Sequence, residues 1–246
     1  MRAVLLGATK GMGRALARLL AERGDALYLL GRDADDLARS AADLQIRGAH
    51  GSVGVGHCDL LDVATFGPAL DDAVRTLGGV DLVVVSAGLF ATQDALEQDA
   101  DLRGRLLSAD FTNTIQFCEL ARGYLLAGGG GKRLCVFSSV AGDRARKPVL
   151  LYGAAKAGLS YYLTGLDHKF SAQGLKTILV KPGFVKTGMV DGLPVPPFAG
   201  EPEGVARVVL RAIDRGRPVV YAPGIWRWIM LVIRSLPRAV MRRIGF

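Results

Sequence analysis

Three residue types that can act on a carbonyl group, serine, tyrosine and lysine, follow one another between residues 138 and 156. Tyr152 and Lys156 are four residues apart in a run of helical composition, so both side chains are expected on one helix face. A phenol has a pKa of about 10 and is a poor acid–base catalyst at neutral pH, whereas an ammonium group one turn away lowers that pKa. Ser139 follows the apolar run 134–137, which is typical of a buried strand. Its hydroxyl is expected at the carboxyl edge of that strand, where it can donate to a substrate oxygen that Tyr152 protonates.

Each member of this set also has a purely structural explanation. A tyrosine and a lysine occur at helical spacing by chance, and a serine pair after a strand often caps a helix or forms a turn. The order of the other motifs along the chain favours a functional interpretation. These motifs are Gly7, Gly11 and Gly13 near the N-terminus, Asn113 in mid-chain, and Pro182 with Gly183 after a late apolar run.

Taken together, the motifs resemble the short-chain dehydrogenase/reductase family over nearly the whole chain. That family has the glycine pattern Gly-x-x-x-Gly-x-Gly and an active site of Asn, Ser and Tyr-x-x-x-Lys. The resemblance implies that Asn113 holds a water that relays protons to the lysine, and an asparagine inside a helix is otherwise disfavoured. The implied catalytic residues are Asn113, Ser139, Tyr152 and Lys156.

The glycine motif lies between a predicted buried strand at 2–7 and a predicted helix at 14–23. Gly7 would permit the tight turn that leaves the strand. Gly11 and Gly13 would let the backbone approach a pyrophosphate and let the helix pack on the sheet. The sequence therefore predicts a dinucleotide site at this turn.

The end of the second predicted strand, 26–30, indicates which dinucleotide is preferred. NAD-binding folds usually place an acid here for the ribose diol. Arg32, with Lys10 in reach, is instead suited to the 2′-phosphate of NADP(H). The alternatives are that Arg32 stacks on the adenine and that Asp33 leaves NAD(H) possible.

The resemblance implies the rest of the cofactor site. Asp59 would hydrogen-bond the adenine, the backbone at Val185 would face the carboxamide, and Thr187 would donate to a cofactor oxygen. A helix-cap role suits Asp62 better than Asp59. Ser86 replaces the family's asparagine before Ala-Gly, a departure that concerns bracing of the sheet. The full predicted cofactor set is Gly7, Thr9, Lys10, Gly11, Met12, Gly13, Arg32, Asp59, Leu60, Ala87, Gly88, Tyr152, Lys156, Pro182, Gly183, Val185 and Thr187.

The expected fold is α/β, a Rossmann-type doubly wound sheet of seven parallel strands in three layers, with strand order 3-2-1-4-5-6-7. It is a single dinucleotide-binding and catalytic domain over 1–223, followed by a basic amphipathic tail over 224–246. One uninterrupted helix is expected over 102–126, a mobile basic linker over 143–148, and a substrate lid over 188–202, which is rich in proline and glycine. The remaining strands are expected at 52–57, 81–85, 134–138, 175–181 and 219–221, with helices starting at 34 and covering 201–215.

The tail reads as an amphipathic helix broken near Pro237. Its apolar stripe suits either a membrane surface or packing against the subunit's own core or a partner subunit, and the absence of acids favours the membrane. The stripe consists of Trp226, Ile229, Met230 and Ile233, with Arg227, Arg234, Arg238 and Arg242 on the opposite side.

Composition excludes several other classes of function. The chain has 246 residues and a net charge of +8, and the excess of positive charge is concentrated in the tail. Basic residues do not alternate with aromatic ones elsewhere, so nucleic acid is not an expected partner. Three cysteines without paired spacing, and no cleavable leader, predict reduced thiols and a cytoplasmic protein. The three histidines have no metal-site spacing.

The predicted reaction is the NADPH-dependent reduction of a ketone. Within the family, residues 142–146, the Tyr152–Gly153 helix start and the tail resemble the reductase that acts on a decaprenylphosphoryl 2-keto-ribose. That resemblance implies a polyprenyl-phosphate-linked 2-keto-pentose reduced to its arabinose epimer, peripheral contact with the inner face of the cell membrane, and Arg144, Arg146 and Lys147 near the phosphate. The alternatives are another bulky apolar ketone, such as a 3-oxoacyl thioester or a steroid-like compound, and a non-catalytic NADP-binding sensor. The resemblance to the family also implies that the protein forms a homodimer or a homotetramer.

Overall fold

The computed structural model describes residues 1–129 and 131–245 and contains one seven-stranded parallel sheet of order β3-β2-β1-β4-β5-β6-β7. The predicted fold class and strand order are confirmed. The strands are β1 (Arg2–Leu6), β2 (Ala26–Gly31), β3 (Gly54–His57), β4 (Leu82–Val85), β5 (Lys132–Phe137), β6 (Leu175–Pro182) and β7 (Val219–Ala222).

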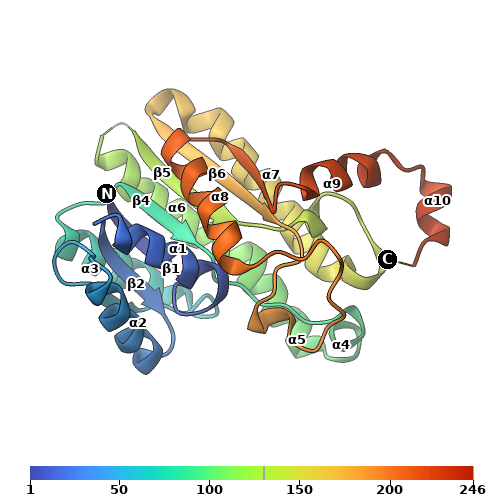
Figure 1. The fold of residues 1–246 in the computed structure, drawn as a ribbon, viewed down its shortest axis with the longest axis horizontal. Coiled ribbons are helices and arrows are strands. Elements are labelled where there is room, and N and C mark those ends of the chain that lie inside the picture. Colours follow the sequence, from blue (N-terminus) through green and yellow to red (C-terminus); the bar gives the residue numbers. More distant parts are fainter. Residues whose placement is uncertain (130, 246) are drawn as a thin grey trace.

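Helices cover both faces of this sheet and give the three layers seen in Figure 1. One face carries α1 (Gly11–Glu22), α2 (Ala34–Ile46) and α8 (Pro202–Arg215), and the other carries α3 (Phe66–Leu77), α6 (Asn113–Ala127) and α7 (Leu150–Phe170). The central strands are mostly apolar, and β4 is apolar throughout, because both faces of the sheet are buried. Two main cores result, one on each side of the sheet.

The central strands bring the sequence motifs to one edge of the sheet. β1 pairs with β2 on one side and with β4 on the other, so Leu6 lies beside both Leu30 and Val85. The chain therefore leaves these three strands at a topological switch point, where open α/β sheets bind ligands. The glycine turn follows β1 at this edge, and Ser139 follows β5.

The segment 102–126 is helical, as predicted, but it is not one continuous α-helix. A five-residue π-helical turn, Ser108–Thr112, separates α5 (Ala100–Leu107) from α6, and a short α4 (Gln93–Gln98) precedes them. Each π turn adds a residue relative to α-helical spacing, so the side chains beyond it are rotated around the axis. Asn113 is consequently the first residue of α6 and directly follows the π turn.

The tail forms two helices, α9 (Trp226–Ser235) and α10 (Arg238–Arg243), which lie at one end of the molecule (Figure 1), and the break near Pro237 is confirmed. The predicted apolar stripe is not available to a membrane. Trp226, Met230 and Ile233 are buried against Val140, with Phe184 packed beside them. The opposite face of α9 is also apolar. Its exposed apolar residues are Trp228, Leu231 and Val232, and the exposed Ile225 directly precedes the helix. Among the described residues, no helix is long and apolar enough to cross a bilayer.

Gly183→Ala should loosen this tail, because a Cβ at residue 183 would lie 2.1 Å from the indole nitrogen of Trp226. Overpacking of this kind lowers the free energy of unfolding by about 1–3 kcal/mol. Thermal unfolding and tryptophan fluorescence would measure the effect. Gly224→Ala is the matched control, since its Cβ would meet nothing within 4 Å. Equal stability of the two variants would refute the described packing of Trp226 on this turn.

Candidate active site

The turn between β1 and α1 has free hydrogen-bond donors at the start of the helix. α1 begins at Gly11, three residues before the predicted start, and Lys10 caps it without a side-chain hydrogen bond. No acidic residue lies in its first turn. The first backbone N–H groups of a helix have no partner within it, and they carry the positive end of the helix dipole. The turn therefore fits a phosphate group.

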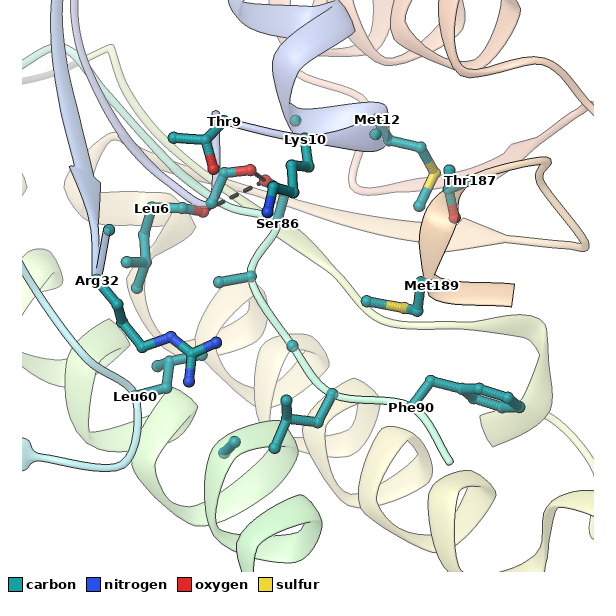
Figure 2. A pocket seen from close by; sticks show the side chains of 18 of the residues that line it. Leu6, Thr9, Lys10, Met12, Arg32, Leu60, Ser86, Phe90, Thr187 and Met189 are labelled. Carbon is teal, nitrogen blue, oxygen red and sulfur yellow. Dashed lines mark hydrogen bonds between the residues drawn. The ribbon is translucent and has the colours of Figure 1, made fainter. Parts of the chain in front are cut away.

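Glycine is required at two positions of this turn. Gly7 has a φ of +95°, which side-chain-bearing residues rarely adopt. A Cβ on Gly13 would lie 2.2 Å from the Ser86 Oγ and 2.3 Å from the Gly7 carbonyl oxygen. The Ser86 hydroxyl donates to the Leu6 and Gly7 carbonyls, so this serine braces the turn against β4 in place of the family's asparagine (Figure 2).

A cleft of about 540 Å³ runs along this edge of the sheet. Figure 2 shows Arg32 at one end and Phe90 with Met189 at the other. Tyr152, Lys156, Pro182, Gly183 and Val185 do not line it. The predicted cofactor residues that do line it are Gly7, Thr9, Lys10, Gly11, Met12, Gly13, Arg32, Asp59, Leu60, Ala87, Gly88 and Thr187. The cleft and the uncapped helix start together fit a dinucleotide.

The Arg32 end of the cleft carries positive charge. Asp33 is engaged at the start of α2, where its carboxylate accepts the Asp36 backbone N–H at 2.8 Å and caps the helix. Lys10 pairs with Asp36 at 3.0 Å, but 81% of its side chain is exposed, so it can still reach an anion. These contacts favour a 2′-phosphate over a ribose diol at this end.

Asn113 lies away from the proposed catalytic group, which corrects its predicted role. Its side-chain amide donates to the Leu60 carbonyl at 2.7 Å, and its oxygen accepts from Gln116. Leu60 and Asp59 line the cleft, and Asp59 itself accepts the Leu61 N–H at 2.9 Å. Asn113 thus holds the loop after β3 in place.

The residue that faces Lys156 is Asp110, in the π turn. Its carboxylate is fully buried, with one oxygen 3.6 Å from the Lys156 Nζ and the other accepting the Leu89 N–H at 2.7 Å. The oxygen nearest the lysine has no hydrogen-bond partner in the described part of the chain. Burial raises the pKa of the Asp110 carboxyl, and the lysine's charge opposes that rise. The sequence signal was a lone acid within the apolar stretch 106–111.

Tyr152 and Lys156 lie on one face of α7, as predicted. The Lys156 Nζ is 5.7 Å from the centre of the Tyr152 ring, and the ring packs edge-to-face on Phe90, which lines the cleft. The predicted lowering of the Tyr152 pKa is not found. Burial raises the pKa of the Tyr152 hydroxyl, the negative charge of Asp110 raises it further, and Ser139 acts in the opposite direction.

The two serines after β5 have different positions. The Ser138 hydroxyl is buried and bonds to the Lys156 carbonyl and the Ser160 hydroxyl, so it joins α7 to the sheet. Ser139 accepts the Ala141 N–H at 3.1 Å and begins a 3-10 turn, Val140–Gly142. The Ser139 hydroxyl also acts on Tyr152, whose pKa it lowers, and its donation to a substrate oxygen stays a prediction.

The basic linker before α7 is anchored, which corrects the prediction that it is mobile. Asp143 accepts from the Lys181 ammonium at 2.5 Å and from the Tyr221 hydroxyl at 2.7 Å. Arg144 donates to the Leu236 carbonyl at 2.7 Å. The loop between Ser139 and Tyr152 is therefore tied to β6, β7 and the tail. The end of the predicted lid is tied down too, by backbone hydrogen bonds between residues 184–186 and Gly200.

The chain forms a doubly wound sheet. At one edge of this sheet lie a helix N-terminus that fits a phosphate and a Ser–Tyr–Lys group, and this combination is that of an NAD(P)-dependent oxidoreductase. The sequence profile of the short chain dehydrogenase family matches residues 1–194, and the chain belongs to that family.

Individual relatives agree with this assignment. An uncharacterised oxidoreductase of Mycobacterium tuberculosis is 35% identical over 98% of this chain and 95% of its own length. Carbonyl reductase family member 4 of Xenopus tropicalis is 31% identical over 85% of this chain and 89% of its own length. A short-chain dehydrogenase from Sphingobium yanoikuyae, solved in complex with NADPH, has the same fold, with a TM-score of 0.82 at 24% identity over 96% of this chain and 97% of that one.

Proposed function

We propose that the chain is an NADP(H)-dependent ketone reductase. The observation that carries this proposal is the proximity of Tyr152, Lys156 and Asp110 to the cleft that begins at the uncapped start of α1. A Cβ on the cleft residue Gly88 would lie 2.7 Å from Asp110 and 3.4 Å from the Lys156 Nζ. A hydride donor bound in the cleft would thus have the acid–base group beside it. The bound nicotinamide would supply the hydride.

The residues of the chain would divide the remaining work. Ser139 would donate a hydrogen bond to the substrate carbonyl oxygen, and Tyr152 would give that oxygen its proton. Lys156 would hold the nicotinamide ribose. Asp110 would fix the Lys156 ammonium and keep the Tyr152 hydroxyl protonated.

The cofactor proposal predicts a selective effect of Arg32→Gln. Its guanidinium would make charge-assisted hydrogen bonds to the 2′-phosphate, so the Kd for NADPH should rise about 10- to 100-fold while that for NADH changes little. Fluorescence titration of both nucleotides measures this. Arg39→Gln, an exposed arginine paired with Asp36 in α2, is the control. Equal weakening of both nucleotides by Arg32→Gln would mean that the guanidinium stacks on the adenine instead.

For the substrate, we propose a polyprenylphosphoryl 2-keto-pentose, reduced to the arabinose epimer. A second apolar surface at the tail supports an amphiphilic substrate, because Trp228, Leu231 and Val232 are each more than half exposed on α9 beside the arginines of the tail. Together these residues would hold the enzyme at the inner membrane surface. The alternative substrate is another bulky apolar ketone, such as a 3-oxoacyl thioester.

A two-substrate assay separates these possibilities. NADPH oxidation would be followed with a polyprenylphosphoryl 2-keto-pentose and with a 3-oxoacyl thioester. Turnover of the sugar lipid alone supports the proposed substrate, and turnover of the thioester alone rejects it. If NADPH binds and neither ketone nor a wider panel reacts, a non-catalytic NADP-binding role replaces the reductase.

A further inference from the structure

A second cavity of about 350 Å³ lies between the loop before α7 and the helix α10. It shares no lining residue with the dinucleotide cleft. Its wall is made of five cationic side chains with small and apolar ones between them: Arg144, Ala145, Arg146, Lys147, Leu150, Arg238, Met241 and Arg242.

The positive charge of this cavity is not balanced within the described part of the chain. None of its five cationic side chains forms an ion pair with a described carboxylate. The nearest acid in the sequence, Asp143, is engaged by Lys181 and Tyr221. Like charges held this close repel one another, so the cavity attracts an anion.

Two of the cationic residues fix the shape of the cavity. Arg144 donates to the Leu236 carbonyl, and Lys147 donates to the Arg242 carbonyl at 2.8 Å. These contacts join segments more than ninety residues apart and hold α10 against the loop. The cavity is therefore formed in the folded chain, before any ligand arrives.

Arg146 is the group that most needs a ligand. Its Nε is buried and has no acceptor among residues 1–129 and 131–245. Burial lowers the pKa of its guanidinium, because desolvation disfavours the charged form. A phosphate oxygen would satisfy this donor, and the planar guanidinium can bind phosphate through two hydrogen bonds.

The apolar part of the wall indicates what the phosphate is attached to. Leu150 is 49% exposed in the loop-side wall, and Met241 faces the cavity from α10. The described residues of the lining include no aromatic side chain on which a base would stack. We propose that this cavity binds the phosphate ester of an amphiphile, with its alkyl chain along Leu150 and Met241. This proposal rests on the proposed substrate, whose phosphate the sequence placed near Arg144, Arg146 and Lys147, but binding at the cavity can be measured without any reduction.

Calorimetry with decyl phosphate below its micelle concentration tests the proposal on the full chain. Saturable binding is expected, weakened about 10- to 100-fold by Arg146→Gln through loss of charge-assisted hydrogen bonds. Arg207→Gln, which removes the same charge from the exposed face of α8, should leave the affinity within about twofold, because exposed charges are screened by salt. If Arg146→Gln does not fold, Arg242→Gln is the second test variant. It removes a charge from the cavity but retains the backbone carbonyl that accepts from Lys147.

Two further measurements distinguish a bilayer lipid from a single amphiphile as the source of the phosphate. Sedimentation with phosphatidic acid vesicles that depends on Arg146 identifies a bilayer lipid, whereas decyl phosphate binding without sedimentation identifies a single amphiphile, such as a lipid-linked substrate. Inorganic phosphate binding as tightly as decyl phosphate would overturn the amphiphile assignment. No saturable binding, or equal loss in Arg207→Gln, would overturn the site. A Tyr152→Phe protein should bind decyl phosphate with the affinity of the wild type. Loss of reductase activity can therefore be told apart from loss of this binding site.

Discussion

Tyr152→Phe is expected to lower kcat for ketone reduction about 100- to 10 000-fold, the usual contribution of a positioned proton donor. Phenylalanine keeps the ring, so the edge-to-face contact with Phe90 and the shape of the site are retained. Only the proton for the carbonyl oxygen is lost. Steady-state NADPH oxidation with a reactive ketone measures the loss, and the Kd for NADPH should change little.

Tyr161→Phe is the matched control, because Tyr161 is 85% exposed on the same helix, α7. It should retain wild-type turnover and stability. If Tyr152→Phe turns over as fast as Tyr161→Phe, the phenol is not the proton donor. If Tyr152→Phe also loses NADPH binding, the substitution has damaged the site and the result must be repeated with stability measured alongside.

Asp110→Asn is expected to move the alkaline limb of the kcat/KM profile for reduction to lower pH, by about one unit or more. Reduction needs a protonated Tyr152, so its rate falls as pH rises through the pKa of that phenol. The negative charge of Asp110 raises this pKa. Removing the charge lowers it, and the rate then falls at a lower pH. Asparagine retains an oxygen to accept the Leu89 N–H.

The pH profile separates this electrostatic role from a structural one. Asp101→Asn, an exposed acid of α5, changes the net charge equally and should leave the limb in place. A lower rate with an unmoved limb in Asp110→Asn would show that the carboxylate only supports packing. The fold should be checked by thermal unfolding, because removing one partner of a buried ion pair destabilises proteins by about 3–5 kcal/mol.

Most of the fold could be predicted because its signals are local. Apolar strand runs, the glycine turn and the tyrosine–lysine spacing each depend on a few neighbouring residues. Asn113 was assigned from its place in the family's order of motifs, whereas the residue beside Lys156 is Asp110, in the π turn Ser108–Thr112. A motif order does not show which of several neighbouring polar residues a π turn directs toward the lysine.

For the tail, the sequence alone could not show which helix face is buried. Helical spacing identified the stripe that contains Trp226 and Met230, but both faces of α9 are apolar, and only the packing on Val140 shows which one is buried. Likewise, Arg146 and Arg242 lie almost a hundred residues apart, and no local pattern indicates that they share a cavity. Contacts between distant segments decide these features.

Hydride transfer itself is the most direct test of the account. The protein would be incubated with NADPH deuterated at the nicotinamide C4 and with a panel of ketones that includes the polyprenylphosphoryl 2-keto-pentose, and the products would be analysed by mass spectrometry. The proposed function predicts one deuterium on the carbinol carbon of the product, with oxidation of an equal amount of cofactor. Tight binding of NADPH with no deuterium in any product would contradict it, and the chain would then be a binder of the nucleotide.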